Sequence, residues 1–61
     1  MSVKRRDLIA HFEEHGFRFL REGKHAIYTN GIKVIPIKRH RQFDRITANA
    51  LCKQAGIEPK F

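Results

Sequence analysis

The chain has 61 residues, and 13 Lys and Arg against 6 Asp and Glu give it a formal net charge of +7. A chain this short forms one domain and buries only about 60% of the surface that its unfolded form exposes, which excludes a separate cofactor domain or a deep cleft between two domains. No stretch reaches the roughly 18 apolar residues of a membrane span, and residues 1–7 lack the apolar run of a secretory signal. The single cysteine, Cys52, cannot form an internal disulfide. We therefore expect a cytoplasmic protein with no membrane attachment.

The charge surplus favours a polyanionic partner. A hydrophobic content of 41% is typical of a folded domain, so the positive charge is expected on a folded surface and not on a disordered tail. Nucleic acid comes first among the partners, followed by acidic proteins and anionic membranes. A merely soluble basic domain has the same composition, so the positions of the charges must decide.

The first predicted element is an amphipathic helix over about residues 3–15. Ser2 is a good N-cap, and apolar side chains recur at helical spacing at Leu8, Ile9 and Phe12. Gly16 follows where a left-handed residue commonly ends a helix.

Three strands are predicted next, over residues 17–22, 25–29 and 32–38. Asn30-Gly31 between two β-prone runs is a strong hairpin signal, because both turn residues must accept positive φ. A two-residue turn there would pair Thr29 with Ile32, Ile27 with Val34, and His25 with Pro36. Since proline has no N–H, the third strand is expected to be an edge strand or to end near Pro36.

A basic loop over residues 39–43 leads into a second helix capped by Asp44 or Thr47. Its apolar positions are Ala48, Leu51, Cys52 and Ala55. Gly56 ends this helix and Pro59 prevents it from resuming. The order α-β-β-β-α predicts an α+β two-layer sandwich, with both helices on one face of a three-stranded antiparallel sheet.

Two groups of cations stand out. Lys4, Arg5 and Arg6 occupy the first turn of the first helix, which is the wrong sign for the helix dipole. They either contact an anion or are solvated charges at a frayed terminus. The second group runs from the third strand into the second helix, with one lysine on the adjacent hairpin. We call it the basic ridge. Its cations are Lys24, Lys33, Lys38, Arg39, Arg41 and Arg45, and the uncharged His40 between them is a further candidate for RNA binding. The ridge could follow a phosphate backbone.

Two other patterns suggest chemistry less strongly. His11 and His15 match a zinc-protease string, H-x-x-E-H, but no third ligand is evident. We therefore expect both histidines on the solvent face of the helix and no metal. Cys52 lies on an apolar helix stripe, where a buried and inert thiol is expected.

His25 follows Gly23-Lys24 at the start of the hairpin, where a glycine turn would let a ligand approach the backbone closely. A neutral imidazole can take a proton from a ribose 2′-hydroxyl, while nearby lysines and arginines stabilise charge on the phosphate. Alternatively, the ring packs against Phe17 or Pro36 and serves the structure alone.

Three segments together resemble a known family. They are Gly23-Lys24-His25-Ala26-Ile27-Tyr28, Val34-Ile35-Pro36-Ile37 and Cys52-Lys53-Gln54-Ala55-Gly56-Ile57. With the α-β-β-β-α order, they are similar to HicA-type toxins. The resemblance covers nearly the whole chain, from the first helix to Ile57, and implies a single HicA-like domain over residues 1–61.

The resemblance implies a double-stranded-RNA-binding-domain-like fold and an mRNA interferase activity that needs neither metal nor cofactor. It also implies a HicB-like antitoxin as the protein partner. The family's catalytic histidine, in its Gly-Ser-His motif, falls on His25, and the glycine of that motif falls on Gly23. Two positions differ: Lys24 replaces the usual serine, and Lys38 stands where the family often has a histidine, with His40 close by.

The sequence therefore predicts a toxin that cleaves mRNA, with His25 as general base and the basic ridge on the RNA. The group that protonates the leaving oxygen stays open among His40, Lys38, Tyr28 and water. The alternative is a non-catalytic RNA-binding module of the same fold, and a third possibility is an interaction domain for an acidic partner.

Overall fold

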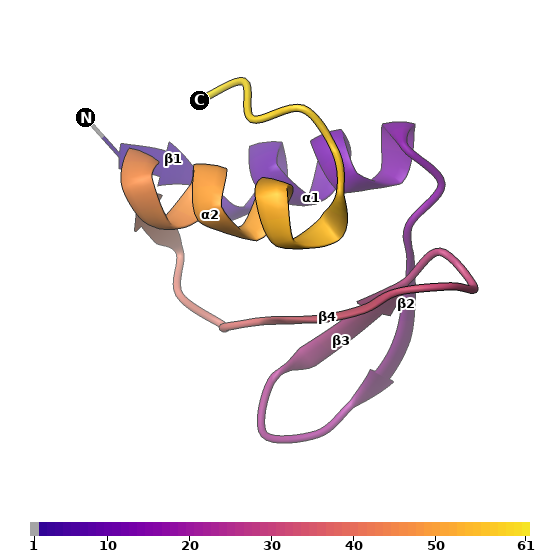
Figure 1. Cartoon of the computed structure of the whole chain (residues 1–61). Helices are drawn as coiled ribbons and strands as arrows, with labels where there is room; N and C mark the ends of the chain where they lie inside the picture. The colour runs from indigo at the N-terminus through magenta and orange to yellow at the C-terminus, as the bar shows by residue number, and fades with distance from the viewer. Residues whose placement is uncertain (1) are drawn as a thin grey trace.

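The computed structural model describes residues 2–61. Its elements are β1 (Ser2–Lys4), α1 (Arg5–Glu14), β2 (Arg18–Glu22), β3 (Ala26–Thr29), β4 (Val34–Ile37), β5 (Gln42–Asp44) and α2 (Arg45–Ala55). Both helices lie on one face of an antiparallel sheet with the order β2-β3-β4, whose other face is left uncovered (Figure 1). The α-β-β-β-α sandwich expected from the sequence is confirmed. None of the helices in residues 2–61 is long and apolar enough to cross a membrane.

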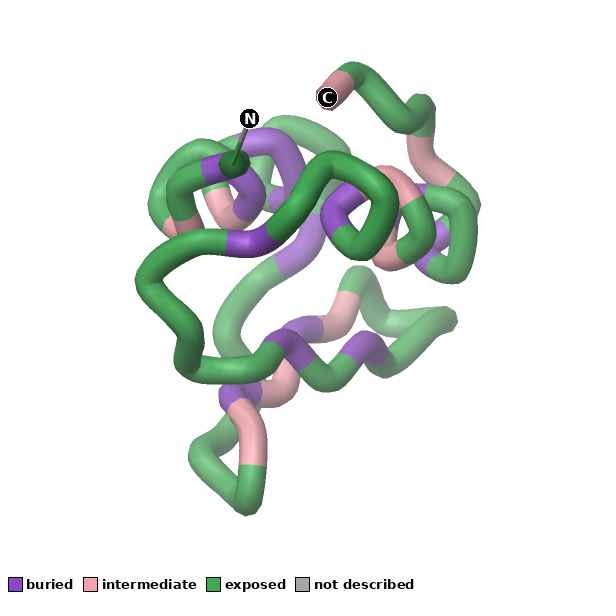
Figure 2. The backbone as a smooth tube through the Cα atoms, turned by 90° about the vertical axis from the view of Figure 1, so that its left-hand side faces the viewer, coloured by how far each residue is buried: buried purple, intermediate pink, exposed green. Residues whose placement is uncertain are grey.

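The core lies between the helices and the sheet. Along β3 and β4, buried positions alternate with more exposed ones (Figure 2), as expected for a sheet with one face covered. Ala26, Tyr28, Ile35 and Ile37 face the helices. From α1, the Phe12 side chain is fully buried, and its ring centroid lies 5.1 Å from that of the next phenylalanine, Phe17. The two-residue period therefore fixes which side of each strand remains free for a ligand.

The start of the first helix was predicted wrongly. Residues 2–4 form a strand that pairs with residues 42–44, so the helix begins at Arg5 and the predicted basic loop ends in β5. Each three-residue strand has a buried apolar centre, Val3 in β1 and Phe43 in β5, between exposed polar residues. Ser2 is not a cap, because its Oγ donates a hydrogen bond of 2.8 Å to Gln42 Oε1. The N-cap position is Lys4, without a side-chain cap.

The hairpin register also differs from the prediction. The β3–β4 connection is a four-residue loop over residues 30–33, and Ile27, not His25, pairs with Pro36. The amide oxygen of Asn30 explains the longer loop, since it accepts backbone hydrogen bonds from Ile32 at 3.0 Å and Lys33 at 2.8 Å. A side chain that closes such a turn offers the chain an alternative to the two-residue hairpin.

The second helix follows the sequence prediction closely. Asp44 is its N-cap, with a carboxylate oxygen that accepts a 2.8 Å hydrogen bond from the Thr47 N–H. Hydrogen bonding by the Thr47 side chain, and after it by the Thr47 backbone, lowers the pKa of the Asp44 carboxyl. At the other end, Gly56 has φ +75°, the left-handed conformation that ends many helices. Cys52 is fully buried on the inner face, with Ala48 and Ala55, and Leu51 is partly buried.

Candidate active site

His25 lies at the end of the tight turn between β2 and β3, directly before the first residue of β3. The turn is closed by a 3.0 Å hydrogen bond from the Gly23 N–H to the His25 carbonyl oxygen. The residue is half-buried. Among residues 2–61, no hydrogen bond is made by its ring, in contrast to those of His11 and His15. The imidazole is therefore held by its backbone while its nitrogens remain available to a ligand.

Lys38 directly follows β4, and His25 directly precedes β3. The last paired residues of β3 and β4 are Ala26 and Ile37, and continuing this register by one residue sets Lys38 opposite His25. Residues facing one another in antiparallel strands share a side of the sheet. Since Ala26 and Ile37 point into the core, alternation directs the His25 and Lys38 side chains to the uncovered face.

Arg39 ties the next segment of the chain to the same turn. Its guanidinium Nη2 donates a 2.7 Å hydrogen bond to the Gly23 carbonyl oxygen and forms an ion pair with Glu22. The loop after β4 is therefore fixed against the turn that precedes His25. A histidine with free nitrogens and three neighbouring cations, Lys24, Lys38 and Arg39, is an arrangement suited to an anionic substrate.

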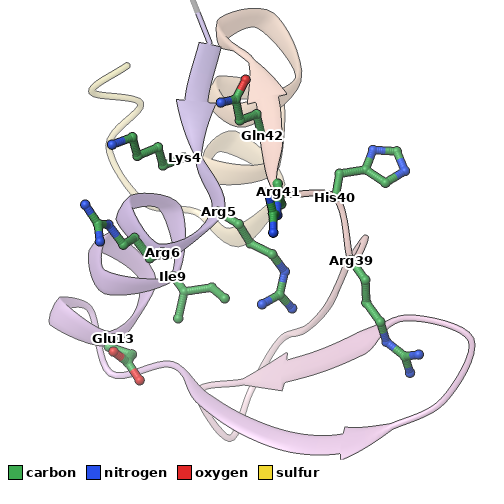
Figure 3. A pocket seen from close by; sticks show the side chains of 9 residues that line it. All are labelled: Lys4, Arg5, Arg6, Ile9, Glu13, Arg39, His40, Arg41 and Gln42. Carbon is green, nitrogen blue, oxygen red and sulfur yellow. The ribbon is translucent and has the colours of Figure 1, made fainter.

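An open hollow of about 710 Å³ lies between the start of α1 and the segment 39–42 (Figure 3), and it includes Arg39, which contacts the turn. We call it the basic hollow, because its lining includes Lys4, Arg5, Arg6, Arg39 and Arg41. Glu13 is the one carboxylate in the lining, and His40 also contributes. The structure therefore joins the two cation groups that the sequence left separate. The sequence feature that pointed to an anion site at the first helix was the positive charge on its first turn, which the helix dipole disfavours.

A family model described as the HicA toxin of bacterial toxin–antitoxin matches residues 5–57. The chain belongs to the HicA toxin family. HicA toxins are generally endoribonucleases and work in toxin–antitoxin pairs, so this chain is the toxin of such a pair and has an antitoxin partner. The matched range runs from α1 past the end of α2 and includes the Gly23–His25 turn. Comparison with curated proteins and with solved structures found no significant match.

The remaining residues of the basic ridge are dispersed in this HicA toxin. Lys33 lies at the opposite end of β4 from Lys38, and its Nζ would be 2.8 Å from a Cβ added at Gly56, so it sits at the end of α2. Arg45 is the first residue of α2 and is not in the lining of the basic hollow. His40 stacks on Phe43, with ring centroids 5.9 Å apart, and lines both the basic hollow and a neighbouring one of about 340 Å³.

One candidate acid is placed away from His25. Tyr28 is buried on the helix side of the sheet, where its ring packs edge-on against Phe19 at 5.7 Å. Continuing the alternation of β3 by one residue beyond Ala26 would direct the His25 side chain to the other side. Of the four candidates for the leaving-group proton in this HicA toxin, Tyr28 is therefore the one that the fold separates from the site.

The histidine pair of α1 serves the structure. The expectation that both lie on the solvent face was wrong for His11, which is only 4% exposed. Its Nε2 donates a 2.7 Å hydrogen bond to the Glu58 carbonyl oxygen, and its ring packs edge-on against Phe61. These contacts hold the C-terminal segment over the helices, as Figure 1 shows.

No set of three or more His, Cys, Asp or Glu side chains within residues 2–61 is arranged to hold a metal ion. The remaining candidate nucleophile, Cys52, is fully buried, and burial raises the pKa of its thiol. A protonated thiol in the core is unreactive.

Proposed function

We propose that residues 1–61 act as a single HicA-like domain and a metal-independent mRNA interferase of the cytoplasm, with His25 as the general base. The observation that carries this proposal is the free, half-buried imidazole of His25 on a closed glycine turn, with Lys38 across the sheet and Arg39 bound to the turn. Family membership supports the reaction class.

The chemistry uses the substrate's own nucleophile. His25 takes the proton of a ribose 2′-hydroxyl, and the 2′-oxygen attacks the adjacent phosphorus while the bond to the 5′-oxygen breaks. Lys24, Lys38 and Arg39 stabilise the negative charge that develops on the phosphate oxygens. The products are a 2′,3′-cyclic phosphate and a 5′-hydroxyl. Because the nucleophile is internal and the phosphate charge is met by side chains, the reaction requires no metal.

The proton for the leaving oxygen comes from a second group. Lys38 is the candidate that the register sets opposite His25, and an ammonium there both donates a proton and stabilises charge. His40 and water remain alternatives. The outer ridge residues Arg41, His40 and Arg45 contact flanking phosphates, whereas Lys33, at the far end of β4, contacts only RNA that extends along the sheet.

The antitoxin partner is a HicB-like protein that blocks this site. Silencing the enzyme requires that His25 or the basic ridge be covered, and a cationic surface is best complemented by acidic or aromatic side chains. Crosslinking or a structure of the complex tests this, since an antitoxin that leaves His25 accessible to RNA would contradict it.

The function is tested with wild type, His25→Ala and a matched control, His15→Ala, which alters an exposed histidine at the far end of α1. We expect His25→Ala to lower the cleavage rate by about 100-fold to 10,000-fold with nearly unchanged RNA affinity, and His15→Ala to retain cleavage. Mass spectrometry of the fragments should show cyclic phosphate ends. Equal RNA decay and equal growth inhibition by wild type and His25→Ala would refute the proposal.

Two further outcomes have defined meanings. Steeply salt-dependent RNA binding without cleavage by wild type would identify a non-catalytic RNA-binding module. Loss of cleavage on addition of EDTA would contradict the metal-independent mechanism.

A further inference from the structure

The basic hollow gathers more positive charge than the ion pairs of residues 2–61 neutralise. Of its five Lys and Arg side chains, only Arg39 forms an ion pair, with Glu22, among residues 2–61. Three of these cations lie in or beside the first turn of α1, where the helix dipole disfavours positive charge. Like charges in one hollow also repel one another. The free protein is therefore less stable than it would be with neutral residues at these positions.

The walls of the hollow are fixed before any ligand binds. β1 and β5 pair with each other over three residues, which joins the N-terminal wall to the segment 39–42. The Arg5 N–H donates a 2.8 Å hydrogen bond to the Arg41 carbonyl oxygen, and its Nε donates one of 3.3 Å to the carbonyl oxygen of Lys38. In Figure 3 the Arg5 side chain extends into the space between the start of α1 and residues 39–42, whereas the Lys4 and Arg6 side chains point away from residues 39–42, along the outer rim of the lining. A preformed cationic surface binds anions at a smaller ordering cost.

The hollow is continuous with the His25 turn through Arg39. This residue lines the hollow, and its side chain extends toward the β2–β3 hairpin (Figure 3), where it contacts the Gly23 carbonyl oxygen. A chain of phosphates lying in the hollow would thus pass from the start of α1 along residues 39–41 to Arg39, whose guanidinium contacts the turn that precedes His25.

We propose that the basic hollow binds the sugar–phosphate backbone of single-stranded RNA next to the cleaved bond, which makes Lys4, Arg5 and Arg6 substrate-binding residues. This inference rests on the proposed function. Guanidinium groups match phosphate oxygens in geometry as well as in charge, and four of the five cations are arginines. A single strand is favoured because attack by the 2′-oxygen opposite the leaving oxygen needs a backbone that is free to rotate.

The experiment compares two double variants with the same reduction in charge. Arg6→Gln/Arg41→Gln removes two exposed cations of the hollow, and Lys53→Gln/Lys60→Gln removes two exposed cations that are not in its lining. Binding is measured by fluorescence anisotropy with a labelled 12-nucleotide 2′-O-methyl RNA, over a series of salt concentrations. This probe lacks the 2′-hydroxyl and cannot be cleaved, so the measurement does not depend on His25 being a base.

We expect the hollow variant to bind more weakly, and the negative slope of log affinity against log salt to become shallower by about 1.4, or about 0.7 for each phosphate that is no longer neutralised. The control variant should change this slope much less. The effect should be similar for probes of different sequence, since binding to phosphates carries no sequence information. The hollow variant should also melt at the same or a higher temperature than wild type, which a merely structural role would not produce.

Three results would overturn the inference. Equally weakened binding in the two double variants would show that only net charge matters. Unchanged binding in the hollow variant would exclude the hollow as the RNA site. Unchanged RNA binding together with weakened antitoxin binding would identify the hollow as a protein interface. A failure of His25→Ala to reduce cleavage would refute the proposed base while leaving this binding result intact.

Discussion

Gly23 is the one glycine of this chain that the fold itself does not require. Gly16, Gly31 and Gly56 all have positive φ, and Gly23 does not. A Cβ added at position 23 would meet only the His25 carbonyl oxygen, at an ordinary contact distance of 3.8 Å. The space around Gly23 and its backbone conformation would both accept a side chain. Under the proposed function, a substrate that approaches the turn closely accounts for the glycine.

The substitution Gly23→Ala should therefore separate stability from activity. Where the native backbone suits alanine, this change stabilises a protein by about 0.4–1 kcal/mol, because the unfolded chain loses conformational freedom. For a domain of this size that corresponds to a rise of about 2–8 °C in the melting temperature. Cleavage should fall by up to about 100-fold, since a methyl group that displaces the phosphate by about 1 Å spoils the alignment with His25.

The matched control is Gly16→Ala. Gly16 has φ +86° and nothing within 4 Å of an added Cβ, so this variant measures backbone strain alone, at a cost of about 1–2 kcal/mol. Thermal melts followed by circular dichroism and single-turnover cleavage of a labelled RNA provide the two readouts. Full cleavage activity in Gly23→Ala would refute the close-approach argument, and a lowered melting temperature would refute the structural reasoning.

Three other perturbations follow from the same structure. The side chains of the Arg39–Glu22 pair are 51% and 57% exposed. A double-mutant cycle, with unfolding free energies measured by urea denaturation, should therefore give a coupling free energy of only about 0.2–1 kcal/mol; a value above about 2 kcal/mol would contradict this. Phe12→Ala should cost about 3–5 kcal/mol, a large share of the total of about 3–9 kcal/mol for a chain of this length. Its thermal melt followed by circular dichroism should therefore shift to a much lower temperature, and a cooperative melt close to that of wild type would exclude this. Because hydrogen bonding lowers the pKa of Asp44 below its ordinary value of 3.8, this carboxylate stabilises α2 above pH 3.8 and loses its effect as the pH falls through the lowered pKa. The melting temperature should therefore drop less on acidification in Asp44→Ala than in wild type, and parallel curves would show that the cap contributes nothing.

The helices were predictable from sequence because their signals are local. The stripe of α2 and its two ends at Asp44 and Gly56 depend on residues within a few positions of one another. The sandwich followed because both apolar stripes had to be covered. In contrast, β1 and β5 are three residues each and pair across a separation of about forty positions. Such short segments carry too little periodicity to be recognised, although both read polar–apolar–polar, as in Ser2-Val3-Lys4.

The hairpin shows how a small error in register alters the site. Replacing a two-residue turn with a four-residue loop shifts the pairing by two positions, which preserves the side of the sheet that each residue faces. The buried residues Ile35 and Ile37 were therefore unaffected. The residue opposite His25 did change. Pro36 pairs with Ile27, and continuing the register by one residue sets Lys38, not Pro36, opposite the histidine. The deciding hydrogen bonds, made by the Asn30 side chain, could not be ranked against a hairpin turn from sequence alone.

The convergence of the cations could not be read from the chain either, because it depends on main-chain hydrogen bonds between distant segments. The Arg5 N–H binds the Arg41 carbonyl oxygen, and the Arg39 side chain binds the Gly23 carbonyl oxygen. Each of these two interactions uses a backbone oxygen as acceptor, so neither of them neutralises a positive charge; Arg39 alone of the hollow's cations also pairs with a carboxylate among residues 2–61, that of Glu22. Such an arrangement of cations on the surface is important in a protein too small to enclose a substrate. The proposed surface site needs cations that are mostly unpaired and a rigid backbone. Of the five cations of the basic hollow, only Arg39 forms an ion pair among residues 2–61, and these hydrogen bonds fix the backbone around them.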